Sequence, residues 1–379
     1  MSTLQYISTE VGNIESALRR LWNGESQQSQ AEPVVRARTL NLIACSDVEH
    51  AQSTAELLEL VTAYSPGRTI VITPAPTTSN QEVQVRVCAS CLASRAGSRV
   101  FGRELIVIEA KASAHDRLPS MVEGLLVPDL PVFLWWRDLG SLDDKLFQKF
   151  SSKARRIIVD STDLAHAGDL LRLQQVVKHI CPRQAVSDLA WSRLTVWREL
   201  TAQFFDGAKG AVYLQRLNRI VVEHAALENS GKGIPADAIL FAAWFASRLQ
   251  CARPARSEQK ALSAQGGKLS WQLQRVGGSL SIELQSAPGA RPGLSRLELI
   301  SEGNPPASFK VVSMQRGGME TRAEIKGNSP IRRIVRGRNQ SPDVMVRKEL
   351  EIIGRDALYE EVLDVACELV GGAQPAAGN

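Results

Sequence analysis

The sequence predicts an α/β N-terminal domain followed by an α+β C-terminal domain. Between residues 34 and 180, short apolar β-branched runs alternate with segments of helical periodicity, which is typical of a mixed, mostly parallel sheet with helices on both faces. After about residue 267, short segments of alternating polarity are separated by glycine pairs, as in antiparallel hairpins, and a helical pattern closes the chain. We place the domains at 1–185 and 186–379, with a linker-like stretch at about 251–267.

The N-terminal elements follow from apolar periodicity. Period-two or continuous apolar runs predict strands, and apolar residues three and four apart predict helices. The expected strands are 34–45, 67–73, 82–93, 103–111, 129–136 and 154–160, and the expected helices are 10–22, 47–64, 114–124, 141–150 and 161–180.

The C-terminal elements follow in the same way. We expect helices over 186–206, 235–250 and 345–370, and strands over 217–226, 268–289, 294–301 and 307–327, with turns at the two glycine pairs.

Length and composition narrow the class of protein. A chain of 379 residues exceeds one compact core of ordinary size. Its 44% hydrophobic and 22% charged residues are those of a globular protein, and a net charge of +5 does not indicate a nucleic-acid binder. No apolar stretch is long enough to span a membrane, and the first residues resemble no signal peptide. We therefore expect a cytoplasmic protein with its six cysteines reduced.

The stretch LLVPDLPVFLWW, residues 125–136, predicts a central strand that ends in Trp135 and Trp136. Side chains alternate between the faces of a strand, and here both faces are apolar. The two indoles either complete the core or bind a partner. The second interpretation stays open because ligands and partners dock at strand ends in α/β sheets.

The predicted helix over 188–205 carries two stripes. One is apolar and faces the core. The other combines Asp188, Trp191, Thr195 and Arg198 at steps of three and four, and Arg193 lies off both. This second stripe is either a half-buried helix edge or a contact surface, since tryptophan and arginine dominate interface energies.

The stretch IRRIVRGR, residues 331–338, concentrates basic side chains, including Arg332, Arg333 and Arg336. Three interpretations remain open: a solvated turn, a docking surface for an acidic partner, and a phosphate site.

Four blocks of this sequence resemble the glucose-6-phosphate dehydrogenase assembly proteins, the OpcA family. They are SPGRTIVI at 65–72, LLVPDLPVFLWWRD at 125–138, RRIIVDS at 155–161 and SDLAWSRLTVWRELTAQFFD at 187–206. The resemblance implies a non-catalytic assembly factor or allosteric activator that binds glucose-6-phosphate dehydrogenase in the oxidative pentose phosphate pathway. As partner-binding residues we predict Trp135, Trp136, Asp188, Trp191, Arg193, Arg198, Arg332, Arg333 and Arg336.

The residues themselves indicate no catalytic site, cofactor or metal. Neither a Walker loop, a G-x-G-x-x-G fingerprint nor a G-x-S-x-G elbow is present. Cys88 and Cys91 form a lone C-x-x-C within a predicted strand, which favours two small core residues over a metal or redox pair. The alternative function is a sugar-phosphate-binding enzyme or sensor that uses the α/β domain, with Arg68, Lys153 and Arg156 holding the phosphate.

Overall fold

The structure is a computed structural model that describes residues 5–28, 38–93, 100–164, 167–225, 234–252, 268–288, 292–315, 317–336, 341–352 and 354–371. The chain forms two compact units. Unit 1 comprises residues 1–159, 179–187 and 341–355, and unit 2 comprises residues 160–178, 188–340 and 356–379. The chain therefore passes between the units several times, which a single boundary at 185 and 186 does not describe.

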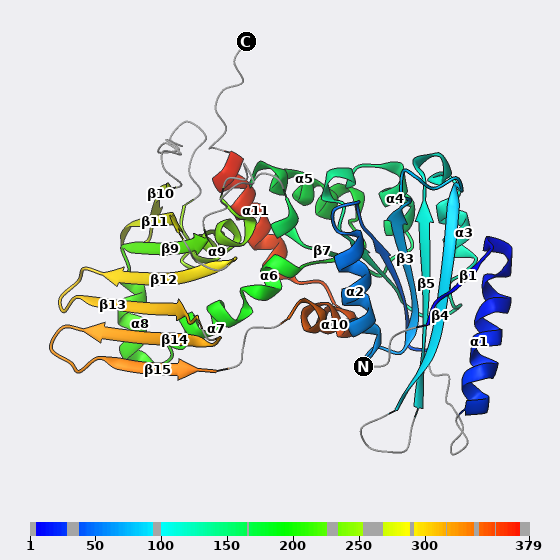
Figure 1. The fold of residues 1–379 in the computed structure, drawn as a ribbon. Coiled ribbons are helices and arrows are strands. Elements are labelled where there is room, and N and C mark those ends of the chain that lie inside the picture. Colours follow the sequence, from blue (N-terminus) through cyan, green and yellow to red (C-terminus); the bar gives the residue numbers. More distant parts are fainter. Residues whose placement is uncertain are drawn as a thin grey trace, which may run out of the picture. The chain divides into compact units, whose positions relative to one another are not determined.

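The first sheet has eight strands in the order β1-β4-β5-β3-β2-β6-β7-β8 (Figure 1). Neighbours from β5 to β7 pair in parallel, whereas β4 pairs antiparallel with both β5 and β1. The strands are β1 (Ile7–Thr9), β2 (Leu40–Cys45), β3 (Gly67–Pro74), β4 (Val83–Ala93), β5 (Val100–Ala110), β6 (Val132–Trp136), β7 (Arg156–Val159) and β8 (Ala185–Asp188).

Six of these strands have the doubly wound order. Numbered from β2 and leaving out β4, the order β5-β3-β2-β6-β7-β8 is 3-2-1-4-5-6, the arrangement of dinucleotide-binding folds. The strand order reverses between β2 and β6. The predicted mixed, mostly parallel sheet is confirmed, and every residue of β2 and β7 is buried, as their continuous apolar runs require.

Helices cover both faces of this sheet. The ring of Trp136 on β6 meets Phe147 of α4 edge to face at 5.2 Å, while Arg137 bonds to Thr54 of α2. Because Trp136 and Arg137 are consecutive, α2 and α4 lie on opposite faces. The helices of unit 1 are α1 (Ile14–Gln28), α2 (Ala51–Thr62), α3 (Leu118–Glu123), α4 (Lys145–Ser151) and α10 (Pro342–Glu351).

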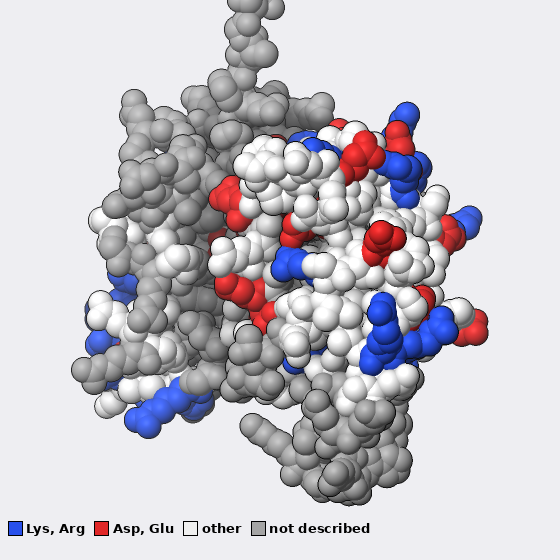
Figure 2. Space-filling model, turned by 45° about the vertical axis from the view of Figure 1, so that its right-hand side comes forward, with Lys and Arg blue, Asp and Glu red and all other residues white. Residues whose placement is uncertain are grey.

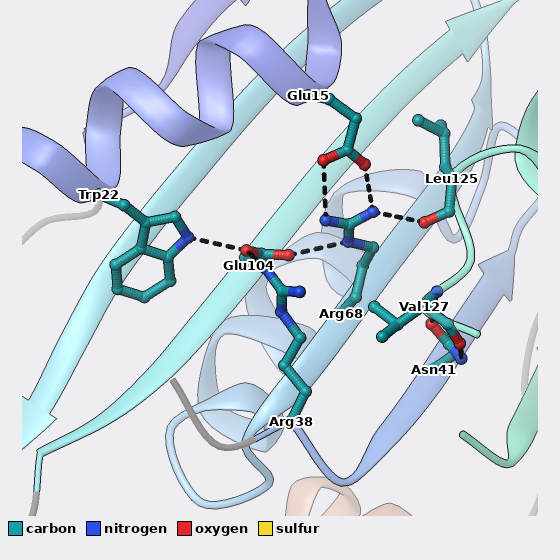
Figure 3. A network of polar contacts seen from close by, with 8 residues as sticks. All are labelled: Glu15, Trp22, Arg38, Asn41, Arg68, Glu104, Leu125 and Val127. Carbon is teal, nitrogen blue, oxygen red and sulfur yellow. Dashed lines mark hydrogen bonds and ion pairs between the residues drawn. The ribbon is translucent and has the colours of Figure 1, made fainter. Parts of the chain in front are cut away.

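A buried polar network closes the amino ends of the parallel strands (Figure 3). Glu104 of β5 accepts hydrogen bonds from Trp22 Nε1 at 2.7 Å and from Arg68 Nε at 2.8 Å, and it also pairs with Arg38. Arg68 of β3 further donates to the Leu125 carbonyl at 2.6 Å and pairs with Glu15 of α1. The network therefore joins α1 to the sheet.

The second sheet has seven strands in the order β10-β11-β9-β12-β13-β14-β15. All neighbours pair antiparallel except β11 and β9, which are parallel. The strands are β9 (Arg219–Ala225), β10 (Lys268–Arg275), β11 (Gly278–Ala287), β12 (Leu294–Ser301), β13 (Ala307–Ser313), β14 (Met319–Ile325) and β15 (Ile331–Val335).

One face of the second sheet is apolar and covered by helices. Phe309 of β13 packs against Phe204, Phe205 and Tyr213, with ring centroids 5.2 to 5.9 Å apart. The opposite face is polar and carries ion pairs such as Arg219–Glu283 and Lys310–Glu298. The helices of unit 2 are α5 (Leu170–Gln175), α6 (Leu189–Arg193), α7 (Thr195–Ala202), α8 (Ala208–Gln215), α9 (Ala236–Arg248) and α11 (Ala357–Gly371). The predicted α+β C-terminal domain with its closing helix is confirmed.

Two predicted helices are in fact interrupted. The segment 186–206 begins as β8 and then forms α6 and α7, because Asp188 ends the strand and caps α6. The segment 345–370 divides into α10 and α11, because Asp356 accepts the backbone N–H of Tyr359 at 2.9 Å and starts a new helix. Most of the predicted linker, residues 253–267, lies outside the described residues.

On the face drawn in Figure 2, basic and acidic side chains of the described residues are interspersed. In the described part of the chain, no helix combines the length and the apolar character that a membrane span needs.

Candidate functional site

The carboxyl ends of β2 and β6 form the candidate ligand site of the first sheet. In doubly wound sheets, ligands bind outside these ends, where the strand order reverses. Trp135 and Trp136 lie here, opposite Ala44 and Cys45 of β2. The sequence predicted the position correctly, because the pair ends an apolar strand.

Both indoles are buried, each with 2% of its surface exposed. Trp136 packs on Phe147 and donates Nε1–H to the Asp138 carbonyl at 2.7 Å. Trp135 lies 5.3 Å from the Arg137 guanidinium, which itself donates to hydroxyls on the first turn of α2. In this conformation neither ring offers a surface to a partner, so the two residues act first as core.

The turn from β2 to α2 lacks the features that hold a dinucleotide. That turn normally carries glycines, which let the backbone approach the pyrophosphate at a helix N-terminus. Here it reads SDVEH, with two carboxylates and no glycine, and Asp47 is engaged by His50 at 2.8 Å. The following strand ends in Thr73 and Pro74, without the acid that binds a ribose.

Asp188 is the centre of a buried cluster in unit 2. Its Oδ1 accepts the backbone N–H groups of Ser161 and Ala190, each at 2.9 Å, and its Oδ2 accepts the Tyr359 hydroxyl at 3.2 Å. Burial, together with the nearby charge of Asp160, raises the pKa of Asp188 to about 6. Asp188 is 1% exposed, so its contacts are internal.

Trp191 and Arg198 lie together, as their helical spacing predicted. The guanidinium is 3.5 Å from the ring centroid, a close cation–π contact. Trp191 is 3% exposed and donates Nε1–H to Asp356 at 2.9 Å. Burial lowers the pKa of Arg198 to about 10. The aromatic member of the predicted stripe is therefore core, and the arginine covers it.

Arg193 forms an ion pair with Asp160 and also donates to Thr162. Burial alone raises the pKa of Asp160, but hydrogen bonds and charge from Arg193 outweigh it and hold that pKa below its usual value. Arg193 remains 31% exposed, so it is anchored yet reachable.

Residues 331–335 of the basic stretch form β15, a strand rather than a turn. Arg332, Arg333 and Arg336 are all exposed, and Arg332 makes a two-bond pair with Glu320, each bond 2.7 Å long. Of the nine residues predicted to bind a partner, these three are the exposed ones.

The cations of the alternative phosphate site are already engaged. Arg68 is held by Glu104 and Glu15. Lys153 pairs with Glu123 at 2.6 Å. Arg156 is 2% exposed and bonds to Ser187 and to the carbonyls of 352 and 354. Arg68 and Arg156 also lie at the start of their strands, at the opposite edge from the usual ligand site.

Several buried polar residues were not predicted from the sequence. Asp160, Asp237 and His224 are 7% exposed or less, and Asp237 lies in the first turn of α9. Burial raises the pKa of Asp237 despite the nearby charge of Arg193. The sequence shows the acid in the first turn of α9, but it does not show that this acid is buried.

Cysteines and acids form no obvious reactive centre in the part of the chain that the structure describes. No group of three His, Cys, Asp or Glu residues there could hold a metal ion. Five cysteines are free thiols: Cys45, Cys88, Cys181, Cys251 and Cys367. The side chain of the sixth, Cys91, lies outside the described residues.

Comparisons with known proteins assign the chain to a family. The glucose-6-phosphate dehydrogenase subunit N-terminal domain matches residues 59–175, and the C-terminal domain of the same subunit matches residues 184–363. The chain is 29% identical to the OxPP cycle protein OpcA of Nostoc punctiforme over 317 residues, or 80% of this chain and 65% of the relative. It is 26% identical to the Synechocystis protein of that name over 338 residues, or 83% and 66% of the two chains. The chain therefore spans about two thirds of the length of these relatives.

Solved structures show a similar fold at low identity. An oxidoreductase of Bacillus subtilis, YvaA, matches with a TM-score of 0.50 and 10% identity, covering 88% of this chain and 96% of that one. The 3-ketoreductase KijD10 of Actinomadura kijaniata, crystallised with NADP, matches with a TM-score of 0.50 and 8% identity, covering 88% and 97%. At such identity the likeness concerns the fold alone.

Proposed function

Because the chain belongs to the OpcA family of glucose-6-phosphate dehydrogenase subunits, we propose that it binds glucose-6-phosphate dehydrogenase and promotes its assembly or activity without catalysing a reaction itself. Such a partner acts by preferring one conformation or assembly state of the enzyme. The proposed site of action is intracellular, where the oxidative pentose phosphate pathway operates.

One observation carries the non-catalytic part of the proposal. The chain has the fold of NADP-dependent oxidoreductases, yet the place of the dinucleotide is altered. The turn after β2 has side chains and two carboxylates where the fingerprint has glycines. The adjacent end of β6 is occupied by buried indoles. A chain with this fold can therefore have a role other than dinucleotide binding, because widely used folds host many unrelated functions.

The nine predicted residues divide into two roles under this proposal. The buried members, among them Trp135, Trp136, Asp188 and Trp191, stabilise the two units. Contact with the enzyme is assigned to the exposed arginines of β15, with Arg193 and Arg198 as partly exposed candidates. Guanidinium groups suit this role because they pair bidentately with carboxylates.

The proposal predicts binding to the enzyme and none to its coenzyme. We expect the purified full chain to bind glucose-6-phosphate dehydrogenase of the same organism saturably, and to change that enzyme's rate or oligomeric state. Titration calorimetry of the chain with NADP or glucose 6-phosphate should give no heat of binding at millimolar ligand.

Two results would contradict this. Turnover of a sugar phosphate by the chain alone would show that it is an enzyme. Absence of any complex in biolayer interferometry, with both proteins folded by circular dichroism, would remove the proposed partner.

A further inference from the structure

Within the described residues, the last strand of the second sheet has no strand on its outer side. β15 is hydrogen-bonded to β14 on one side only. Ile331 is 58% exposed and Ile334 is 50% exposed, although natural edge strands usually display charge or are covered. An edge that combines exposed isoleucine with arginine is a surface on which another strand can pair.

The register shows which backbone groups point outward. The hairpin bond from Met314 N to Gly318 O makes the even-numbered residues of β14 the ones that bond to β13. The odd-numbered residues of β14 then bond to β15, where Thr321 faces Arg333. The N–H and C=O groups of Arg332 and Ile334 therefore lie on the free edge.

The charge of this edge is not neutralised within the described residues. Arg332 is paired with Glu320, but neither Arg333 nor Arg336 has an acidic partner in the described parts of the chain. Both side chains are exposed. The edge therefore presents two cations in addition to its free backbone groups.

A shallow groove of about 490 Å³ adjoins the start of β15. It is lined by the ends of β12, β13 and β14 and reaches Pro330, the residue before Ile331. A strand that pairs along the edge can place a terminal side chain in this groove. The lining includes Ile300, Ala307, Ile325, Lys326, Asn328 and Pro330.

The charges decide between two occupants. A second copy of the chain, paired antiparallel through the same edge, would set arginines against arginines, and like charges directly opposite are destabilising. An extended segment with carboxylates beside Arg333 and Arg336 would instead form charge-assisted bonds. The edge therefore disfavours self-association and fits an acidic strand.

We propose that β15 is a β-augmentation site that receives an extended, acidic segment of the protein partner. The main-chain groups of Arg332 and Ile334 form the hydrogen bonds to the added strand, and Arg333 and Arg336 favour a segment that carries negative charge. This inference rests on the proposed function, because it takes the partner to be glucose-6-phosphate dehydrogenase.

The substitution Ile334→Pro tests the backbone part. It removes an outward N–H while sparing the bonds to β14, and proline is tolerated on a free strand edge. We expect the dissociation constant for the enzyme to rise at least about 10-fold, which corresponds to about 1.4 kcal/mol. The matched control Ile334→Thr keeps the N–H and a β-branched side chain, and it should stay within about 3-fold of wild type.

The double variant Arg333→Glu, Arg336→Glu tests the charge part and does not depend on the proline variant folding. We expect at least a 10-fold loss of affinity at low salt, and a wild-type affinity that falls as salt rises. The control Arg117→Glu, Lys153→Glu reverses two exposed cations of unit 1 and should bind as wild type does.

Each outcome is decisive. If the wild-type chain binds the enzyme and both β15 variants bind equally well while folded, the β15 proposal is wrong and the proposed function stands. If the wild-type chain does not bind, both fall. Dimerisation that Ile334→Pro abolishes would show that a second copy is the occupant instead.

Discussion

Replacing Glu104 by glutamine is expected to lower the free energy of unfolding of unit 1 by about 3 to 5 kcal/mol, the usual cost of breaking a buried ion pair. Glu104 and Arg68 are 1% and 4% exposed, and both lie in the interior with the Trp22 indole (Figure 3). Burial alone raises the pKa of Glu104, but the charges of Arg68 and Arg38 and the hydrogen bonds from Trp22 and Arg68 together keep that pKa below its usual value. Without the carboxylate, the half-exposed Glu15 is the one charged partner that the Arg68 guanidinium keeps among the described residues.

The matched control is Glu82→Gln. Glu82 also pairs with an arginine, Arg117, but the two side chains are 55% and 68% exposed. Solvated pairs of this kind contribute about 0 to 1 kcal/mol. Urea denaturation followed by circular dichroism measures both variants. Equal losses in the two would show that the network around Glu104 does not stabilise the sheet.

The second large effect concerns Asp188. Substitution by alanine should destabilise the chain by about 3 kcal/mol or more, because the N–H groups of Ser161 and Ala190 would lose their acceptor inside the protein. Asparagine keeps an acceptor oxygen and carries no charge. We therefore expect Asp188→Asn to be as stable as wild type at pH 7, or more stable.

The pH dependence of that comparison has a defined sign. The folded-state pKa of Asp188 is raised from 3.8 to about 6, so between these values the folded chain holds a proton that the unfolded chain has lost. The contribution of this carboxyl to stability is therefore fully present below about pH 4 and is lost as pH rises through 6. The loss amounts to about 3 kcal/mol.

Denaturation of wild type and Asp188→Asn at several pH values between 4 and 7 isolates Asp188 with its neighbour Asp160, because carboxyls that do not interact with Asp188 cancel in the difference. The stability of the asparagine variant relative to wild type should increase across the range. A difference that does not change with pH would contradict the raised pKa.

Much of the fold could be predicted because its signals are local. The apolar runs of β2, β3, β6 and β7 are buried on both faces, and such runs have few alternatives to a central parallel strand. Helical spacing likewise placed Arg198 over Trp191. The interruption at Asp188 was missed, because an apolar stripe at helical spacing continues across a strand end.

The candidate site could be predicted only in part. The sequence shows which positions carry arginine and tryptophan. The exposure of these side chains, however, depends on neighbours that are distant in sequence. Trp191 is buried partly by Asp356 and Tyr359, which follow it by more than 160 residues in the sequence. Arg333 is exposed on the last strand of the sheet, and no described strand pairs with the outer side of β15.

By itself, the sequence determined the two sheet-and-helix units, the absence of a glycine fingerprint after the first parallel strand, and the presence of arginines near residue 333. The tertiary structure alone decided that the tryptophans belong to the interior and that the arginines stand on a free strand edge. The physical reason is that periodicity and backbone preference act between near neighbours, whereas burial and strand order arise from contacts between segments that the chain brings together only on folding.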